Sequence, residues 1–95
     1  MQIIQVYPVQ NHLVYVYFAN GEIRLFDASK LIHKGVFEKL ADPDFFCNRC
    51  TVLNDTLAWD LSGTFDPAEC LDIDPHTVYR DSQPCDDPLS VKKAS

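Results

Sequence analysis

The sequence predicts a small α+β protein built on an antiparallel β-meander. Three observations indicate this class. The first third of the chain consists of runs rich in β-branched and aromatic residues. Asn20-Gly21 separates two of these runs, which is the strongest short signal of a β-hairpin. Short helical signals and a second pair of strand-like runs follow. We therefore expect three N-terminal strands, a short helical segment, a second hairpin and short C-terminal helical turns.

Three strands are expected in the first third of the chain, each bounded by turn residues. They cover residues 2–7, 12–19 and 22–26. Pro8 ends the first strand, because proline cannot donate a hydrogen bond to a sheet. Asn20-Gly21 is expected to fill a two-residue type I′ turn, which needs positive φ at both positions.

The two-residue turn fixes how the second and third strands pair. It places Phe18 opposite Ile23 and Tyr17 opposite Arg24, and the alternation of side chains gives the hairpin two faces. One face is wholly apolar and is expected to be the core: Val14, Val16, Phe18, Ile23 and Leu25. The other face combines large rings with polar groups: Tyr15, Tyr17, Glu22, Arg24 and Phe26.

Two short helical pieces are expected after this hairpin. Asp27 is a suitable N-cap for a two-turn helix over residues 28–34, and Gly35 stands where a glycine ends a helix. A second piece covers residues 36–41 and stops before Asp42-Pro43.

A second hairpin is expected from strands at residues 50–54 and 56–60, joined by a tight turn near Asn54-Asp55. Trp59, in the later strand, is interpreted as a core or sheet-face aromatic. Residues 70–73 are expected to form a short edge strand.

The last third of the chain contains two helix-start signals and then a polar stretch. Asp66-Pro67 and Asp74-Pro75 each place an N-cap aspartate before a proline at the first helical position. From Arg80 onward, proline, serine and charged residues replace the aromatic residues. We therefore expect one α+β domain over residues 1–80 and a disordered C-terminal tail over residues 81–95.

Composition restricts the classes of function. The 95 residues include 8 Lys+Arg and 14 Asp+Glu, a net charge of −6, so we expect no large cationic face for nucleic acid. No run approaches the ~18 apolar residues that a membrane span requires. The N-terminus lacks the basic and apolar regions of a signal peptide. We therefore expect a cytoplasmic protein whose four cysteines are free thiols.

The cysteines provide the sharpest local motif, Cys47-Asn48-Arg49-Cys50. A redox pair needs its first sulfur at a helix N-terminus, whereas strand-like residues follow this motif. Adding Cys70 and His76 gives no recognised spacing for zinc. The cysteines at 47, 50 and 70 are therefore interpreted as small apolar residues in or near the core, and we expect no metal and no cofactor.

Neither the histidines nor the carboxylates form a catalytic pattern. His12, His33 and His76 are far apart in the sequence and have no neighbouring nucleophile. The acidic run from Asp60 to Asp74 lacks the spacing of a calcium loop and is interpreted as turns and helix caps. We therefore expect that the protein is not an enzyme.

Several motifs together resemble a known family. They are F-x-N-G-E-x-R-x-F-D at 18–27, Gly35-Val36-Phe37, Leu40, Phe45-Phe46, Trp59, and L-D-I-D-P ahead of Tyr79. This pattern, over roughly residues 2–79, resembles domain of unknown function 2442. The resemblance implies a small bacterial α+β domain with no assigned catalytic residues. In some operons this family lies beside a small gene of another unknown-function family, which implies a toxin–antitoxin arrangement.

The second face of the first hairpin is the remaining candidate for specificity. Tyr15, Tyr17, Arg24 and Phe26 are of the types that dominate protein-binding hot spots, unless a helix of the same chain covers them. We expect a protein-binding accessory module, antitoxin-like toward a small neighbouring protein, whose acidic charge suits a basic partner. The alternative is a small-ligand or metal-binding domain that uses the acidic run or the cysteines.

Overall fold

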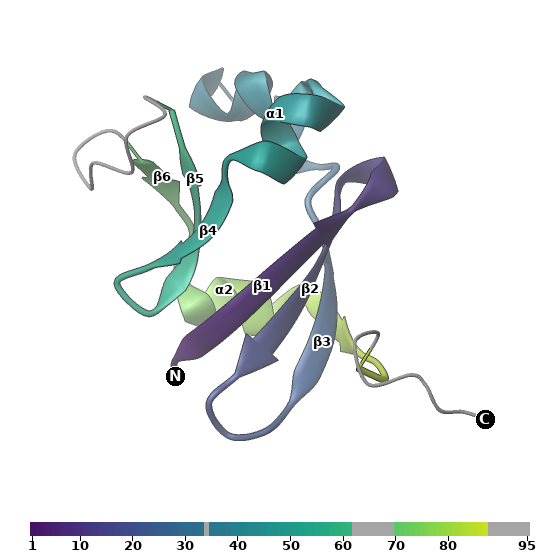
Figure 1. Ribbon diagram of the computed structural model, residues 1–95, viewed down its shortest axis with the longest axis vertical. Helices are drawn as coiled ribbons and strands as arrows, with labels where there is room; N and C mark the ends of the chain where they lie inside the picture. The colour runs from purple at the N-terminus through teal and green to yellow at the C-terminus, as the bar shows by residue number, and fades with distance from the viewer. Residues whose placement is uncertain (34, 62–69, 88–95) are drawn as a thin grey trace.

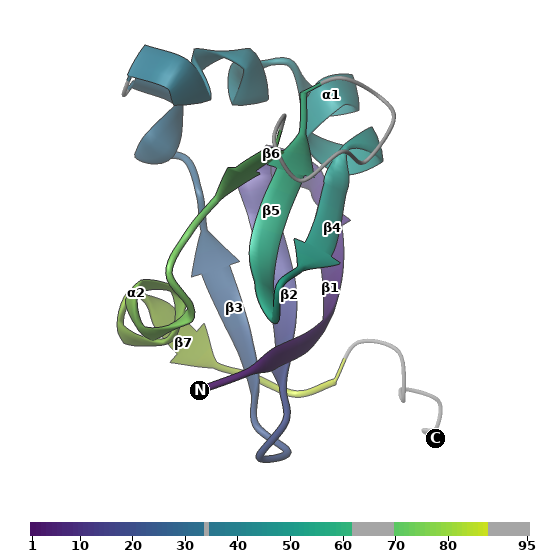
Figure 2. The ribbon, with the colours of Figure 1, turned by 90° about the vertical axis from the view of Figure 1, so that its left-hand side faces the viewer.

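Two antiparallel sheets lie face to face in the computed structural model, which describes residues 1–33, 35–61 and 70–87 (Figures 1 and 2). Short helices close one end and one side of the two sheets (Figures 1 and 2). The α+β class is confirmed, since the three N-terminal strands, the helical segment and the second hairpin are all present.

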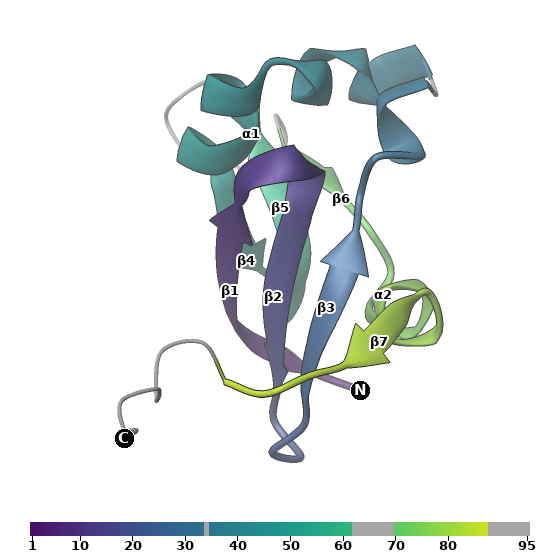
Figure 3. The ribbon, with the colours of Figure 1, turned by 90° about the vertical axis from the view of Figure 1, so that its right-hand side faces the viewer.

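The first sheet has four strands in the order β1-β2-β3-β7. They are β1 (Ile3–Val9), β2 (Leu13–Phe18), β3 (Ile23–Asp27) and β7 (Ser82–Pro84). The first three form the expected meander, although β1 continues through Pro8, so the prediction that Pro8 ends this strand is wrong. β7 pairs antiparallel with β3 from the far end of the chain (Figure 3). The prediction of a disordered tail from residue 81 is therefore wrong for residues 82–84, whose backbone is paired. Residues 88–95 of that predicted tail lie outside the described residues.

The loop between β2 and β3 has three residues instead of two. The N–H of Phe18 donates to the carbonyl of Glu22 at 2.9 Å, and the N–H of Gly21 donates to the carbonyl of Phe18 at 3.0 Å. Gly21 has a φ of 93°, whereas Asn20 is not among the residues with positive φ. Asn20 instead accepts a hydrogen bond from the N–H of Glu22 through its Oδ1 atom, at 2.9 Å. The dipeptide thus forms a three-residue loop with a left-handed glycine.

This difference of one residue inverts the two faces of β3 relative to β2. Arg24 now lies opposite Val16. The core face of the hairpin consists of Val14, Val16, Phe18 and Phe26, each at most 3% exposed. Ile23 and Leu25 lie on the other face and are partly exposed, so the prediction that they belong to the core is wrong.

Replacement of Gly21 by valine is expected to lower the free energy of unfolding by about 1–2 kcal/mol, because a β-branched residue resists positive φ. No atom lies within 4 Å of the position that a Cβ would take, so the cost comes from the backbone alone. Urea denaturation measures the loss. Gly21→Asn, which tolerates positive φ better, should lose clearly less. Equal stability of Gly21→Val and the wild type would contradict the prediction.

The second sheet has the strand order β4-β5-β6 and packs against the first (Figure 2). Its strands are β4 (Cys50–Leu53), β5 (Thr56–Asp60) and β6 (Cys70–Asp72). Asn54 and Asp55 form the expected tight turn, with φ of 52° and 67°, and β6 is the expected edge strand. Every side chain of β5 is buried. The helical turn expected at Asp66-Pro67 lies outside the described residues.

Short helices complete the fold. They are the 3₁₀ helices η1 (Gln10–His12), η2 (Leu31–His33) and η3 (Gly35–Ala41), and the α-helices α1 (Pro43–Asn48) and α2 (Pro75–Arg80). A 3₁₀ helix replaces the expected two-turn helix over residues 28–34, because so short a helix gains few bonds to offset nucleation. Asp42-Pro43 not only ends the preceding helical piece but also begins α1. The carboxylate of Asp42 accepts from the N–H of Asp44 at 3.0 Å and caps α1.

The core lies between the two sheets around Trp59, which is fully buried. Its Nε1 donates to the carbonyl of Phe46 at 3.1 Å, and the two rings lie 5.4 Å apart. Phe46 thereby joins α1 to the second sheet, as Val78 joins α2 to the same core. None of the helices in the described residues combines the length and apolarity needed to cross a bilayer.

Candidate functional site

The four residues of the predicted partner-binding face are divided between the two sides of the first sheet. Tyr15 and Tyr17 lie on the side away from the second sheet, while Arg24 and Phe26 lie on the side of the core. Phe26 is only 3% exposed and packs in the core. The prediction that these four residues share one face is therefore wrong, because it depends on the two-residue turn. Partner binding by Tyr15 and Tyr17 stays a prediction.

Arg24 is held by the C-terminal part of the chain. Its Nε donates to the Oγ of Ser82 at 2.8 Å, and its Nη2 donates to the Ser82 carbonyl at 2.7 Å. The guanidinium carbon lies 4.1 Å from the centre of the Tyr79 ring, and Nη1 is 3.4 Å from the Glu22 carboxylate. With a side chain 13% exposed, Arg24 ties β3 to β7 and α2. The chain itself thus covers this part of the predicted face.

Tyr79 completes this group, which we call the Arg24 cluster (Glu22, Arg24, Tyr79 and Ser82). The Tyr79 hydroxyl lies 2.7 and 2.8 Å from the two carboxylate oxygens of Glu22 and donates its one proton to this carboxylate. This hydrogen bond lowers the pKa of Glu22 and raises the pKa of Tyr79. The Ser82 hydroxyl donates to the Tyr79 carbonyl at 3.0 Å. These polar groups are therefore used to hold segments together.

The other side of the first sheet, which we call the outer face, is aromatic and aliphatic. Its side chains come from all four strands: Gln5, Tyr7, Val9, Leu13, Tyr15, Tyr17, Ile23, Leu25, Asp27 and Gln83. Tyr7 and Tyr15 are cross-strand partners with stacked rings, 6.2 Å between centroids. Tyr7 is 41% exposed, and Ile4 at the neighbouring bulge is 58% exposed. The described helices lie behind this face or at one of its ends (Figure 3).

The segment after β7 crosses one end of the outer face (Figure 3). The N–H of Cys85 donates to the carbonyl of Ile23 at 3.0 Å, and the Tyr17 hydroxyl donates to the Asp87 carboxylate at 2.7 Å. Burial, followed by this hydrogen bond, raises the pKa of Tyr17. The contact falls near the β2–β3 loop, two residues along β2 from Tyr15.

The four cysteines are free thiols in different environments. Cys50 packs against the core, and burial raises its pKa to about 12, so its thiol is a poor nucleophile at neutral pH. Cys47, at the end of α1, is exposed, and its interpretation as a core residue is wrong. The described residues bring together no group of three or more His, Cys, Asp or Glu suited to a metal ion.

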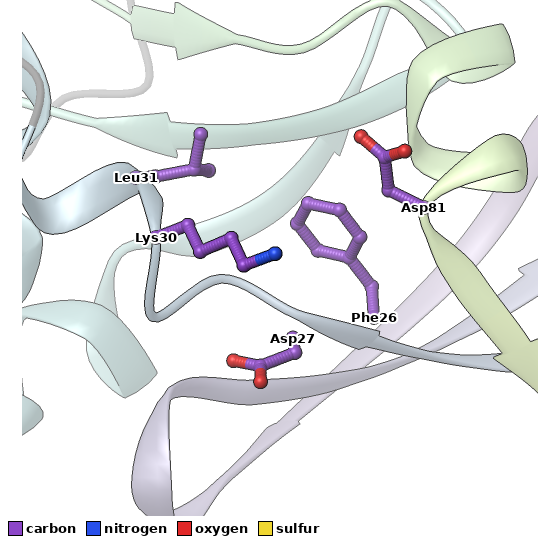
Figure 4. Close-up of a pocket in the computed structure, with 5 residues that line it drawn as sticks. All are labelled: Phe26, Asp27, Lys30, Leu31 and Asp81. Carbon is purple, nitrogen blue, oxygen red and sulfur yellow. The ribbon is translucent and has the colours of Figure 1, made fainter.

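One pocket lies where β3 meets the chain after α2, lined by Phe26, Asp27, Lys30, Leu31 and Asp81 (Figure 4). The Lys30 side chain extends toward the Phe26 ring. The carboxylates of Asp27 and Asp81 lie on opposite sides of this ring. Asp27 accepts a hydrogen bond from Ser29, which lowers its pKa. These lining residues combine opposite charges with an apolar floor, but they include no serine, cysteine or histidine nucleophile.

A second pocket lies between η1 and α1, lined by Val9, Gln10, Asn11, His12, Pro43, Asp44, Phe46 and Cys47. Asn11 and His12 both have positive φ, 66° and 60°. The Nε2 of His12 lies 3.2 Å from the carbonyl of Ala41, and its ring meets Phe46 edge to face. His12 therefore joins the η1 turn to η3 and α1.

A family model described as Protein of unknown function (DUF2442) matches residues 3–84. The chain belongs to this family. The DUF2442 match ends at the last residue of β7, so it includes the whole Arg24 cluster and both sides of the first sheet. No curated protein and no solved structure is significantly similar to this DUF2442 chain.

Sequence reasoning missed Tyr7, Ile23 and Leu25 as residues of the outer face of this DUF2442 domain. Tyr7 lies within the first predicted strand, and pairing that strand with the second would have indicated its position opposite Tyr15. Ile23 and Leu25 were assigned to the other face by the two-residue turn alone.

Proposed function

We propose that this DUF2442 protein is a non-catalytic accessory module that binds another protein through its outer face. The observation that carries this proposal is the apolar and aromatic outer side of a sheet whose inner side already forms the core. An antiparallel sheet with one buried face is usually polar on the other, and an apolar second face indicates an interaction site. Tyrosine is enriched in binding hot spots, and this face presents Tyr7, Tyr15 and Tyr17.

The polar groups described above also support a binding role over a catalytic one. The guanidinium of Arg24 is engaged by Ser82 and Tyr79, and the His12 ring contacts Ala41 and Phe46. These contacts stabilise the fold. An antitoxin-like partnership with a small neighbouring protein, which the family resemblance implies, requires a specific protein surface and no reaction centre.

Photo-crosslinking in cells of the host species tests this proposal. The crosslinking amino acid p-benzoylphenylalanine replaces Tyr15, or in the control Thr51, which lies on β4 facing away from the core. We expect Tyr15→p-benzoylphenylalanine to give a discrete crosslinked protein that is missing with the Thr51 variant. No product at residue 15, or the same products at both positions, would overturn the proposed function.

A further inference from the structure

We infer that the outer face binds a basic amphipathic segment, in which lysine or arginine alternates with apolar residues. This inference rests on the proposed function and adds the chemistry of the partner. It depends on three features of the outer face: its charges, its tyrosine rings and the mismatch that a second copy would create.

The charges of the outer face are negative. Among β1, β2, β3 and β7 the sole lysine or arginine is Arg24, and its guanidinium is engaged on the inner side. Asp27 ends β3 on the outer side, and Asp87 is bound to Tyr17 at the opposite end. Lys30 offsets part of the charge of Asp27 from the neighbouring pocket. A basic segment would therefore meet carboxylates at both ends of an apolar surface, on a chain with a net charge of −6.

The tyrosine rings are suited to the same partner. Cations are attracted to the faces of aromatic rings, and this protein uses such contacts internally. The guanidinium of Arg24 lies 4.1 Å from the centre of the Tyr79 ring, and that of Arg49 lies 5.3 Å from the centre of Phe45. On the outer face, leucine side chains lie beside Tyr15 and would receive the apolar residues of the segment.

A second copy of this chain fits the outer face poorly. In a symmetric dimer each outer face would meet its own equivalent. Asp27 and Asp87 would then face surfaces that carry the same carboxylates and no basic strand residue. Like charges brought together in this way disfavour association.

Binding of designed peptides tests the inference. The probes are a leucine–lysine amphipathic helix, a leucine–glutamate helix with the same apolar pattern, and a glycine–serine–lysine peptide with the charge of the first. Fluorescence anisotropy with the full chain should show binding of the leucine–lysine peptide, weakened by salt. The other two peptides should bind at least about tenfold more weakly.

Matched variants locate the binding site. Tyr15→Lys should lower the affinity for the leucine–lysine peptide by about tenfold. Thr51→Lys makes the same charge change on the second sheet and should change that affinity by about twofold or less. Thermal melts establish that both variants fold. Tyr7→Ala, at an exposed position, provides a milder variant that should also weaken binding.

Four results of the binding and sedimentation experiments would overturn the inference. They are equal binding of the leucine–glutamate peptide, equal effects of Tyr15→Lys and Thr51→Lys, a dimer in sedimentation that Tyr15→Lys dissociates, and binding that tightens about tenfold after truncation at Asp87. The last would mean that residues 88–95 occupy the face. A crosslinked partner whose contacting segment lacks lysine and arginine would also overturn it, while leaving the proposed function intact.

Discussion

Truncation of the chain after Arg80 is expected to lower the free energy of unfolding by about 3 kcal/mol or more. The melting temperature, Tm, should fall by about 10 °C. The truncation removes β7, including Ser82, which is 2% exposed. Arg24 would lose the hydroxyl and the carbonyl that accept two of its hydrogen bonds, and its largely buried charge would be left poorly paired. A disordered tail from residue 81 predicts the opposite result, an unchanged Tm.

Truncation after Asp87 is the matched control. It keeps β7, the Arg24 cluster and the Tyr17–Asp87 hydrogen bond, so Tm should stay close to that of the full chain. Differential scanning calorimetry of the three proteins measures the difference. If both truncations melt at the temperature of the full chain, β7 contributes nothing to stability.

Arg24→Ala is expected to destabilise the protein by about 2–4 kcal/mol, because charged hydrogen bonds and a ring contact are lost together. Glu22 would also lose the neighbouring guanidinium. Arg24→Lys should recover less than half of the loss, since an ammonium cannot reproduce the two bonds to Ser82 and the stacking on Tyr79. Urea denaturation provides the measurement.

Arg80→Ala is the control for this prediction. The Arg80 side chain is 72% exposed and pairs with Asp81 at the surface, so its loss should leave the free energy of unfolding almost unchanged. Arg24→Ala should leave binding at the outer face unchanged in the folded protein. If Arg24→Ala were as stable as Arg80→Ala and weakened crosslinking at residue 15, Arg24 would belong to an interface.

The sequence alone predicted those elements that are determined by a signal within a few neighbouring residues. Asn54-Asp55 joins β4 and β5 because both residues tolerate positive φ, and Asp74-Pro75 begins α2 as expected. Trp59 is in the core, as its place in an apolar strand indicated. These signals depend on local backbone preference and on burial of a large ring.

The candidate site was predicted in part. Tyr15 and Tyr17 do lie away from the core, because their alternation with Val14 and Val16 is a property of one strand. The position of Arg24 required the register between two strands. Asn-Gly is compatible with loops of two or three residues, and the hydrogen bond from the N–H of Glu22 to Asn20 accompanies the longer loop.

Only the tertiary structure decided the role of the C-terminal segment. Ser82-Gln83-Pro84 has no β-branched or aromatic residue and therefore no strand signal of its own. It becomes β7 because α2 returns the chain to the edge of β3, where Arg24 binds Ser82 across 58 residues of sequence. Such a strand is stabilised by pairing with a distant segment, and its own residues have no strand preference. It therefore cannot be recognised from the sequence alone.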